Sequence, residues 1–147
     1  IGRVLLVQVR DIMRTGERNA VAPQTLALRD ALMVMTKAKS GSLAIVDRRG
    51  KLAGGFTDGD FRRRMSTDHD LLTRPLSEVM TQPVQSVGAQ ENVIGALSLM
   101  TRRRIRHLPV VEDGRMVGFV SIGDLVKYRI DRIEADAAAM RDYIQQA

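Results

Sequence analysis

Residues Gly118–Asp124, which read GFVSIGD, decide the fold, because the chain contains the same pattern once before. The earlier copy is Gly54–Asp60, which reads GGFTDGD. In both copies an apolar stretch runs into a hydroxyl residue, and an aspartate follows three positions later. A pattern that returns in this form within 147 residues indicates an internal repeat, which has to be considered before any single element.

Further landmarks repeat in the same order around the two motifs. They are Asp11–Met13 with Glu78–Met80, Val21 with Val87, Ala31–Met35 with Ala96–Met100, and Leu43–Asp47 with Leu108–Glu112. Their order predicts two tandem units, at residues 9–66 and 76–129, followed by a helical extension at residues 130–147.

Each unit reads as strand, helix, strand, turn, strand and helix. In the second unit, short apolar runs bounded by turn residues predict strands at Val84–Val87, Leu108–Val111 and Met116–Val120. Apolar residues at three- and four-residue spacing predict a helix over Glu91–Arg103. A unit of about sixty residues is marginally stable alone. We therefore predict an α/β (α+β) fold, in which the two units pack their apolar faces together with pseudo-twofold symmetry.

The composition excludes several function classes. The chain has no cysteine and two histidines, which leaves little material for a disulfide, a zinc site or a catalytic triad. We therefore expect no catalytic residue, no metal site and no enzymatic activity. No apolar run reaches the length of a membrane helix, and no signal peptide is visible, so we expect a cytoplasmic protein without membrane contact.

The net charge of +6 comes with two arginine clusters, Arg62–Arg64 and Arg102–Arg104. One interpretation is nucleic-acid binding through these clusters. Aromatic residues make up only 3% of the chain, which disfavours single-strand binding by base stacking. The other interpretation is a solvated basic helix face. We therefore expect a nucleic-acid partner to be unlikely.

The repeated hydroxyl and carboxylate have two interpretations. Thr57 with Asp60, and Ser121 with Asp124, have the spacing of a capping box that satisfies unpaired N–H groups at a helix start. Alternatively, the helix start holds a phosphate, and the carboxylate accepts hydrogen bonds from a ribose diol, which together describe a nucleotide site. Glycines in and before each motif would let a ligand approach the backbone: Gly54, Gly55, Gly59, Gly118 and Gly123.

The doubled pattern Gly-x-hydrophobic-Thr/Ser-x-x-Asp, with the apolar strand Leu108–Val111 before its second copy, resembles the CBS domain, the cystathionine β-synthase type repeat. The resemblance covers roughly Val9–Arg129 as a tandem pair. It implies a non-catalytic regulatory module that senses energy or redox state. Its regulatory ligand would be an adenosine nucleotide (AMP, ADP, ATP or NAD(H)) or S-adenosylmethionine, with no catalytic cofactor.

The resemblance also implies roles for individual residues. Asp60 and Asp124 would hold ribose hydroxyls, and Thr57 and Ser121 would lie beside the phosphate. First-strand residues of each unit would line the adenine slot, and the basic residues before the Leu-Pro strand would contact the phosphate. The complete set is Ala20, Val21, Thr57, Asp60, Ser86, Val87, Arg106, His107, Pro109, Ser121 and Asp124.

The two sites should differ in affinity. The second unit carries Arg106 and His107, and an arginine can donate two hydrogen bonds to one phosphate. The equivalent positions of the first unit hold Gly41 and Ser42. We therefore predict that the Asp124 site binds nucleotide more tightly.

The two halves resemble different relatives. Phe56–Arg63 resembles the regulatory tail of arabinose-5-phosphate isomerases, whereas Val120–Lys127 resembles small stand-alone bacterial CBS proteins. One alternative function is therefore that of a detached regulatory tail of a sugar-phosphate isomerase. A basic nucleic-acid-binding protein is the other alternative.

A helical pattern continues from Asp124 to about Ile144, beyond the end of the repeat. Its apolar residues step by four and three positions, as in a heptad pattern: Val126, Ile130, Ile133, Ala137, Met140 and Ile144. The seam predicts either an amphipathic helix on its own domain or a homodimer contact, and the resemblance favours the homodimer.

Overall fold

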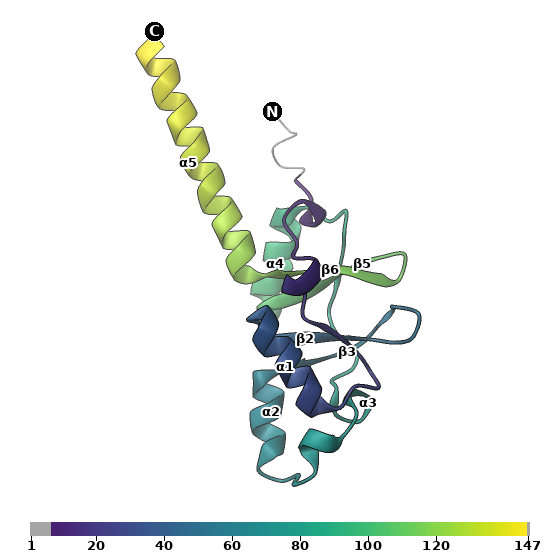
Figure 1. The fold of residues 1–147 in the computed structure, drawn as a ribbon. Coiled ribbons are helices and arrows are strands. Elements are labelled where there is room, and N and C mark those ends of the chain that lie inside the picture. The colour runs from purple at the N-terminus through teal and green to yellow at the C-terminus, as the bar shows by residue number, and fades with distance from the viewer. Residues whose placement is uncertain (1–6, 147) are drawn as a thin grey trace.

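The structure, a computed structural model, describes residues 7–146 and contains one three-stranded sheet in each unit (Figure 1). The first unit consists of β1 (Val21–Pro23), α1 (Leu28–Ala38), β2 (Ser42–Val46), β3 (Leu52–Thr57) and α2 (Asp58–Met65). The second consists of β4 (Val87–Gly88), α4 (Val93–Arg103), β5 (His107–Glu112), β6 (Arg115–Ser121) and α5 (Ile122–Gln146). Two short helical segments, Val9–Asp11 and Gly16–Arg18, precede β1, and two more, Leu71–Thr73 and α3 (Leu76–Val79), lie between α2 and β4. The predicted fold class and element order are confirmed.

The two sheets have the same topology. The first strand of each sheet is parallel to the second, which is antiparallel to the third. The helix between the first two strands, α1 or α4, provides the crossover that a parallel pair requires. Ser42 pairs with Thr57, and His107 pairs with Ser121, so the hydroxyl of each motif ends its strand at the same place.

Register corrects one landmark of the repeat. Val21 pairs with Ala44, whereas Val87 pairs with Val110, which is one position further along the second strand. Ala22 is therefore the equivalent of Val87, and the sequence alignment of Val21 with Val87 was wrong by one residue. The predicted strand over Val84–Val87 is also shorter, because only Val87 and Gly88 pair with β5.

Each unit contributes a leading segment to the core of the other. The leading segments are Val9–Arg14 and Leu76–Thr81. Val9 is fully buried in the core of the second unit, and Leu76 and Val79 are buried in the core of the first. Backbone hydrogen bonds hold both segments, since Arg14 pairs with Phe119 and Thr81 pairs with Gly55. The exchange makes the two units interdependent.

A methionine packs on a glycine at each exchanged contact. A Cβ added at Gly54 would lie 2.6 Å from Sδ of Met80, and one at Gly118 would lie 2.8 Å from Cγ of Met13. The sequence interpretation assigned these glycines to the approach of a ligand. The structure shows that the groups approaching the backbone of Gly54 and Gly118 are side chains of the leading segments.

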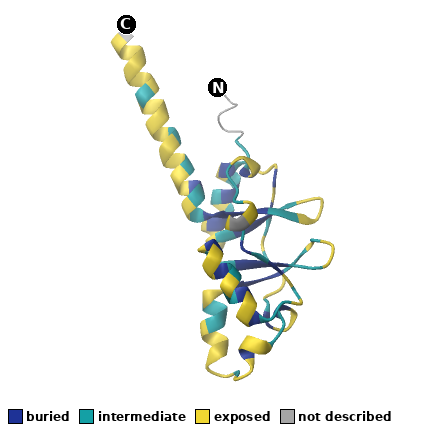
Figure 2. Cartoon of the chain, viewed as in Figure 1, coloured by how far each residue is buried: buried dark blue, intermediate teal, exposed yellow. Residues whose placement is uncertain are grey.

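The last helix projects from the body of the molecule (Figure 2). Leu125 at its start is fully buried, whereas Ile133 is 57% exposed and Met140 is 60% exposed. The interpretation of an amphipathic helix packed on its own domain is therefore wrong beyond the first turns. Ala147, the last residue of the predicted extension, lies outside the described residues. Within residues 7–146, no helix is both long enough and apolar enough to cross a membrane.

The methionine–glycine contact predicts a specific loss of stability. Gly54→Ala should lower the free energy of unfolding by about 1–3 kcal/mol, because its Cβ would overlap Met80 and lie 3.0 Å from the Thr81 carbonyl oxygen. Urea denaturation measures this loss. Gly88→Ala is the matched control, since a Cβ at Gly88 has no atom within 4 Å among the described residues. Equal losses in the two variants would contradict the packing role of Gly54.

Candidate functional site

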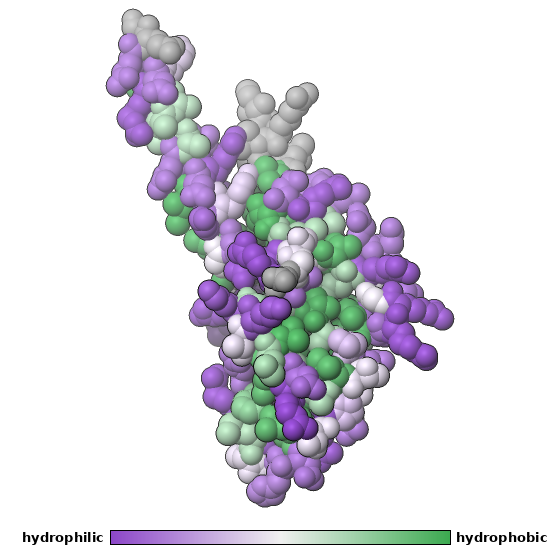
Figure 3. Space-filling view, in the orientation of Figure 1, coloured by the Kyte–Doolittle hydropathy of each residue, from purple (hydrophilic) through white to green (hydrophobic). Residues whose placement is uncertain are grey.

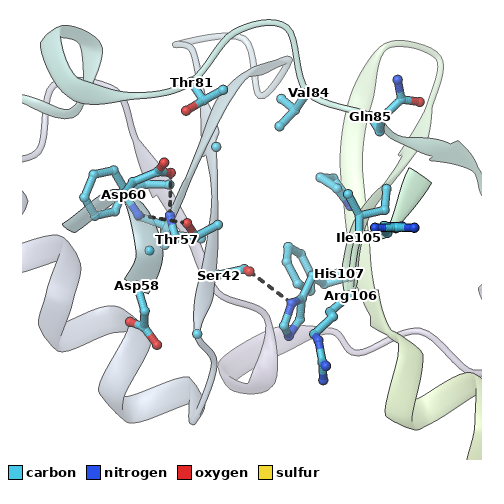
Figure 4. A pocket seen from close by; sticks show the side chains of 18 of the residues that line it. Ser42, Thr57, Asp58, Asp60, Thr81, Val84, Gln85, Ile105, Arg106 and His107 are labelled. Atoms are coloured by element: carbon cyan, nitrogen blue, oxygen red, sulfur yellow. Dashed lines mark hydrogen bonds between the residues drawn. The ribbon is translucent and has the colours of Figure 1, made fainter. Parts of the chain in front are cut away.

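A cavity of about 550 Å³ lies between the two units. Figure 4 shows its two walls, with Thr57, Asp58 and Asp60 on the first unit and Ile105, Arg106 and His107 on the second. The third wall is the end of the second leading segment and the stretch that follows it, with Thr81, Val84 and Gln85. The cavity therefore exists only because both units and their connection meet there.

The first motif forms a capping box at the start of α2. The backbone N–H of Asp60 donates to Oγ1 of Thr57 (3.2 Å), and the N–H of Thr57 donates to the Asp60 carboxylate (3.0 Å). The second oxygen of Asp60 pairs with Arg63, whose side chain is 71% exposed. The Asp60 side chain itself is only 14% exposed, so the pair is open to solvent on the arginine side.

The opposite wall is basic. Arg104, Arg106 and His107 all line the cavity. Arg104 ends α4 in the left-handed conformation (φ 56°), which turns the chain into β5. Two cationic side chains thus line the same cavity as the start of α2, where the helix dipole also favours an anion.

His107 joins the two units. Its Nδ1 lies 3.0 Å from Oγ of Ser42, the equivalent residue of the first unit, and its ring centroid lies 5.7 Å from that of Phe119. Burial is the main cause that lowers the pKa of His107 below 6.5, and repulsion by Arg14 and Arg106 adds to it. Asp124 and Asp58 oppose this shift. We therefore expect a neutral imidazole at pH 7.

The second motif forms the same capping box but is already occupied by another side chain. The N–H of Asp124 donates to Oγ of Ser121 (3.1 Å), and the N–H of Ser121 donates back to the carboxylate (3.2 Å). Arg14 then donates to both carboxylate oxygens, from Nε at 2.9 Å and from Nη2 at 3.1 Å. Burial opposes ionisation of Asp124, but Arg14 and Ser121 outweigh it and lower the pKa of this carboxyl.

The structure separates the candidate residues into groups. Thr57, Asp60, Arg106, His107 and Pro109 line the cavity together. The remaining candidates are not among its lining residues: Ser121 and Asp124 lie at the motif paired with Arg14, Ser86 lines a separate shallow groove, Ala20 and Val87 are buried, and Val21 is half-buried.

The structure adds a second neighbourhood to one grouping. The sequence analysis placed Arg106 and His107 at the Asp124 site, since all three belong to the second unit. In the structure both residues line the cavity that also contains Thr57 and Asp60, because the cavity spans the boundary between the units, while Asp124 still acts on the pKa of His107. Tighter binding at Asp124 stays a prediction.

Sequence reasoning also missed residues of the cavity. Thr81, Val84 and Gln85 lie just before β4, where the sequence predicted a strand from Val84 but no site residue at these three positions. Arg104 belongs to the predicted basic cluster Arg102–Arg104, and Phe119 belongs to the predicted strand Met116–Val120, but neither was predicted to be a site residue. Arg106 and Gly41 are equivalent positions of the two units. This difference could have shown that only one of the two sites has an arginine at this position.

The walls combine three chemistries. Arginines and the positive end of the α2 dipole can hold an anion, and the Asp60 carboxylate can accept hydrogen bonds from hydroxyl groups. Val84, Ile105 and Phe119 add apolar surface that suits an aromatic ring.

Comparison with known proteins identifies the same pair of units. The family described as "CBS domain" matches residues 9–67 and 76–131. Arabinose 5-phosphate isomerase KdsD of Pseudomonas aeruginosa is 39% identical over 131 residues, which cover 86% of this chain and 39% of that protein. The chain therefore spans about two fifths of the length of this curated relative.

Solved structures share the fold. The CBS domain pair of protein MJ0100, in complex with 5′-methylthioadenosine and S-adenosyl-L-methionine, aligns with a TM-score of 0.75 and 26% identity. The alignment covers 86% of this chain and 98% of that one. The CBS-domain protein ATU1752 of Agrobacterium tumefaciens aligns with a TM-score of 0.70 and 26% identity, over 85% of this chain and 95% of that one.

The lowered pKa of His107 predicts a pH dependence of stability. Below about pH 6.5 the unfolded chain binds a proton at this imidazole that the folded chain does not bind, so stability falls as the pH falls. Urea denaturation should show a larger loss between about pH 7 and pH 5 in the wild type than in His107→Gln. The variant retains His69 and every carboxylate, so the difference reports His107 alone. Identical pH profiles would contradict the prediction.

Proposed function

Because the chain belongs to the CBS-domain family, we propose that it is a non-catalytic regulatory module that binds an adenosine nucleotide in the cavity between its units. The observation that carries the proposal is the meeting of the Thr57–Asp60 motif with Arg104, Arg106 and His107 across one cavity. The complex of the MJ0100 domain pair with two adenosine compounds supports the ligand class. The absence of cysteine fits action in the reducing cytoplasm.

Each part of a nucleotide has a suitable partner in the cavity. The ribose hydroxyls donate to Asp60 in place of Arg63. The phosphate lies between the start of α2 and the guanidinium groups of Arg104 and Arg106. The adenine ring lies on the apolar surface that Val84 and Phe119 provide.

The charge of the walls selects among adenosine ligands. Arg104 and Arg106 are opposed by Asp58 and Asp60, which line the same cavity, and His107 is neutral at pH 7. The walls therefore carry little net charge, and like charges near an anion disfavour it. A ligand with few negative charges, such as AMP, should bind more tightly than ATP.

A second candidate function rests on the isomerase relatives. The 39% identity with an arabinose 5-phosphate isomerase over this region favours a regulatory tail of a sugar-phosphate isomerase. In that case nucleotide in the cavity controls an isomerase domain that belongs to the same polypeptide.

Nucleotide binding is tested by thermal shift and calorimetry with AMP, ADP, ATP, NAD, NADH and S-adenosylmethionine. We expect AMP to raise the melting temperature, since a ligand that binds only the folded state stabilises it. Asp60→Asn, which keeps an acceptor for the capping box, should weaken AMP at least about tenfold, as for a lost charge-assisted hydrogen bond.

Two matched variants distinguish a direct contact between Arg106 and the phosphate from an effect of the overall positive charge of the protein. Arg106→Gln should weaken AMP by about tenfold and leave adenosine unchanged, because only AMP carries a phosphate. Arg102→Gln removes the same charge from an exposed position on α4 that does not line the cavity, and it should leave both ligands unchanged. Absence of any shift with all six ligands would reject the proposed function.

The isomerase candidate is tested on the gene product in its source cells. An antibody raised against this chain should detect a polypeptide more than twice as long as 147 residues, as expected from the 39% share of the relative. A product of 16.3 kDa would reject the regulatory tail and leave the stand-alone module.

A further inference from the structure

We infer from the exposed surface of α5 that this helix pairs with α5 of a second copy of the chain, as a parallel, in-register, two-stranded coiled coil. The inference concerns assembly and does not depend on what binds in the cavity between the units. The contact would be the heptad seam of α5, which consists of Val126, Ile130, Ile133, Ala137, Met140 and Ile144.

The heptad seam is open to solvent. Among the described residues, six of the ten exposed large apolar side chains belong to α5. Five of the six are seam residues, and the sixth is Tyr143, which lies beside the seam. In Figure 3, green side chains interrupt the purple surface of this helix. A row of exposed apolar side chains on one element marks an interaction surface.

The helix contacts its own unit through a different face. Leu125 is fully buried, Tyr128 packs against the core of the second unit, and Arg132 is half-buried. These residues are three and four positions apart, so they form one stripe along the helix. Successive residues of an α-helix are about 100° apart, so the seam that begins at Val126 lies about a quarter turn from this stripe. The unit therefore leaves the seam uncovered.

The charge of α5 permits two copies to approach each other. The helix contains five acidic and four basic residues, although the whole chain has a net charge of +6. The helix also projects from the body of the molecule, as Figure 2 shows. Two nearly neutral helices can therefore meet without the repulsion that two strongly basic surfaces would experience.

The charges beside the seam fit a parallel pair. Ile130, Ala137 and Ile144 occupy the a positions of the heptads, so residues 129 and 136 occupy g positions and residues 134 and 141 occupy e positions. In a parallel pair, each g residue faces the next e residue of the other helix. The facing residues are Arg129 with Glu134, and Asp136 with Arg141, so both contacts join opposite charges.

The same charges disfavour an antiparallel pair. In the antiparallel register that overlaps the whole seam, e positions face e positions and g positions face g positions. Glu134 would then face Glu134 of the second copy, and Asp136 would face Asp136. Lys127 would face Arg141. Every flanking contact with a charge on both sides would join like charges, and such contacts select against this orientation.

The pattern is complementary to itself, which favours a second copy over a different protein. In a twofold pair, the g residues of one chain must match the e residues of the same sequence. Both charged contacts of α5 meet this condition. Within one helix, Nε of Arg132 lies 3.8 Å from the Asp136 carboxylate, which is beyond hydrogen-bond distance. Asp136 therefore keeps its acceptor capacity for Arg141 of the second copy.

The core residues and symmetry favour two strands. Isoleucine at a positions 130 and 144 is the residue type that two-stranded parallel coiled coils prefer there. Twofold dimers are also the commonest closed assemblies. The β-branched residues at d positions 126 and 133 also suit higher orders, so the mass of the complex is part of the test.

Sedimentation equilibrium of the whole chain measures that mass. At about 100 micromolar, a concentration at which a dimer of micromolar affinity assembles, we expect the mass of two chains. A monomer at this concentration would overturn the inference, and so would a complex of three or more chains.

A single introduced cysteine tests the orientation, because the chain has none. Met140→Cys, at a d position, should form a disulfide-linked dimer under mild oxidation, since residue 140 meets its own counterpart in a parallel, in-register pair. Asp142→Cys, on the outer face, is the control and should run as a monomer on a non-reducing gel. Equal cross-linking of these two variants would contradict a parallel coiled coil.

Mixing two cysteine variants provides an independent test of the same point. In the antiparallel register, residue 140 lies opposite residue 130 and about 15 Å from its own counterpart. Met140→Cys and Ile130→Cys should therefore each cross-link alone if the pair is parallel. Cross-linking that requires both variants together would show an antiparallel pair and reject the inference.

Charge reversal tests whether the partner is a second copy. Glu134→Arg places two arginines in each of two symmetry-related contacts, so it should raise the dissociation constant of the dimer about tenfold. The added change Arg129→Glu should restore the affinity, because the facing charges are again opposite. Asp131→Arg is the matched control, since it makes the same change of charge on the outer face and should leave the dimer unchanged. Equal effects of Glu134→Arg and Asp131→Arg, or no rescue by Arg129→Glu, would refute the proposed contact.

Discussion

The exchange of leading segments is the constraint on which the rest of the structure depends. Val9 completes the core of the second unit, and Leu76 with Val79 completes the core of the first. Methionines on Gly54 and Gly118 hold the exchanged backbone against the last strand of each sheet. Because each unit lacks part of its own core, the two cannot separate without exposing apolar surface to water. The distance between their facing edges is therefore fixed.

That fixed distance produces the cavity. Its carboxylate and helix start come from the first unit, its basic residues come from the second, and the stretch before β4 closes the third side. His107 and Ser42, equivalent residues of the two units, meet at a hydrogen bond near the boundary. In the proposed function, a ligand in this cavity contacts both units at once and so favours the arrangement in which they meet.

Near-symmetry with a few unequal residues explains why the two motifs differ. Both form capping boxes, so the structural interpretation of the hydroxyl and carboxylate holds at each motif. Thr81 and Arg14 occupy the same place beside them, yet one leaves a cavity and the other forms an ion pair. Two nearly identical motifs thus have different surroundings within one chain.

The sequence by itself determined the repeat, the strands and helices, the capping boxes and the heptad seam, because each of these depends on residues close together in the chain. It also indicated Thr57, Asp60, Arg106 and His107 as candidates for one kind of ligand. Only the tertiary structure decided that all four line one cavity, and that Arg14 donates to Asp124 although 110 positions separate them in the sequence. It also decided that Met80 packs on Gly54 and Met13 on Gly118. These contacts depend on how two units pack against each other, and no local spacing in the sequence carries that information.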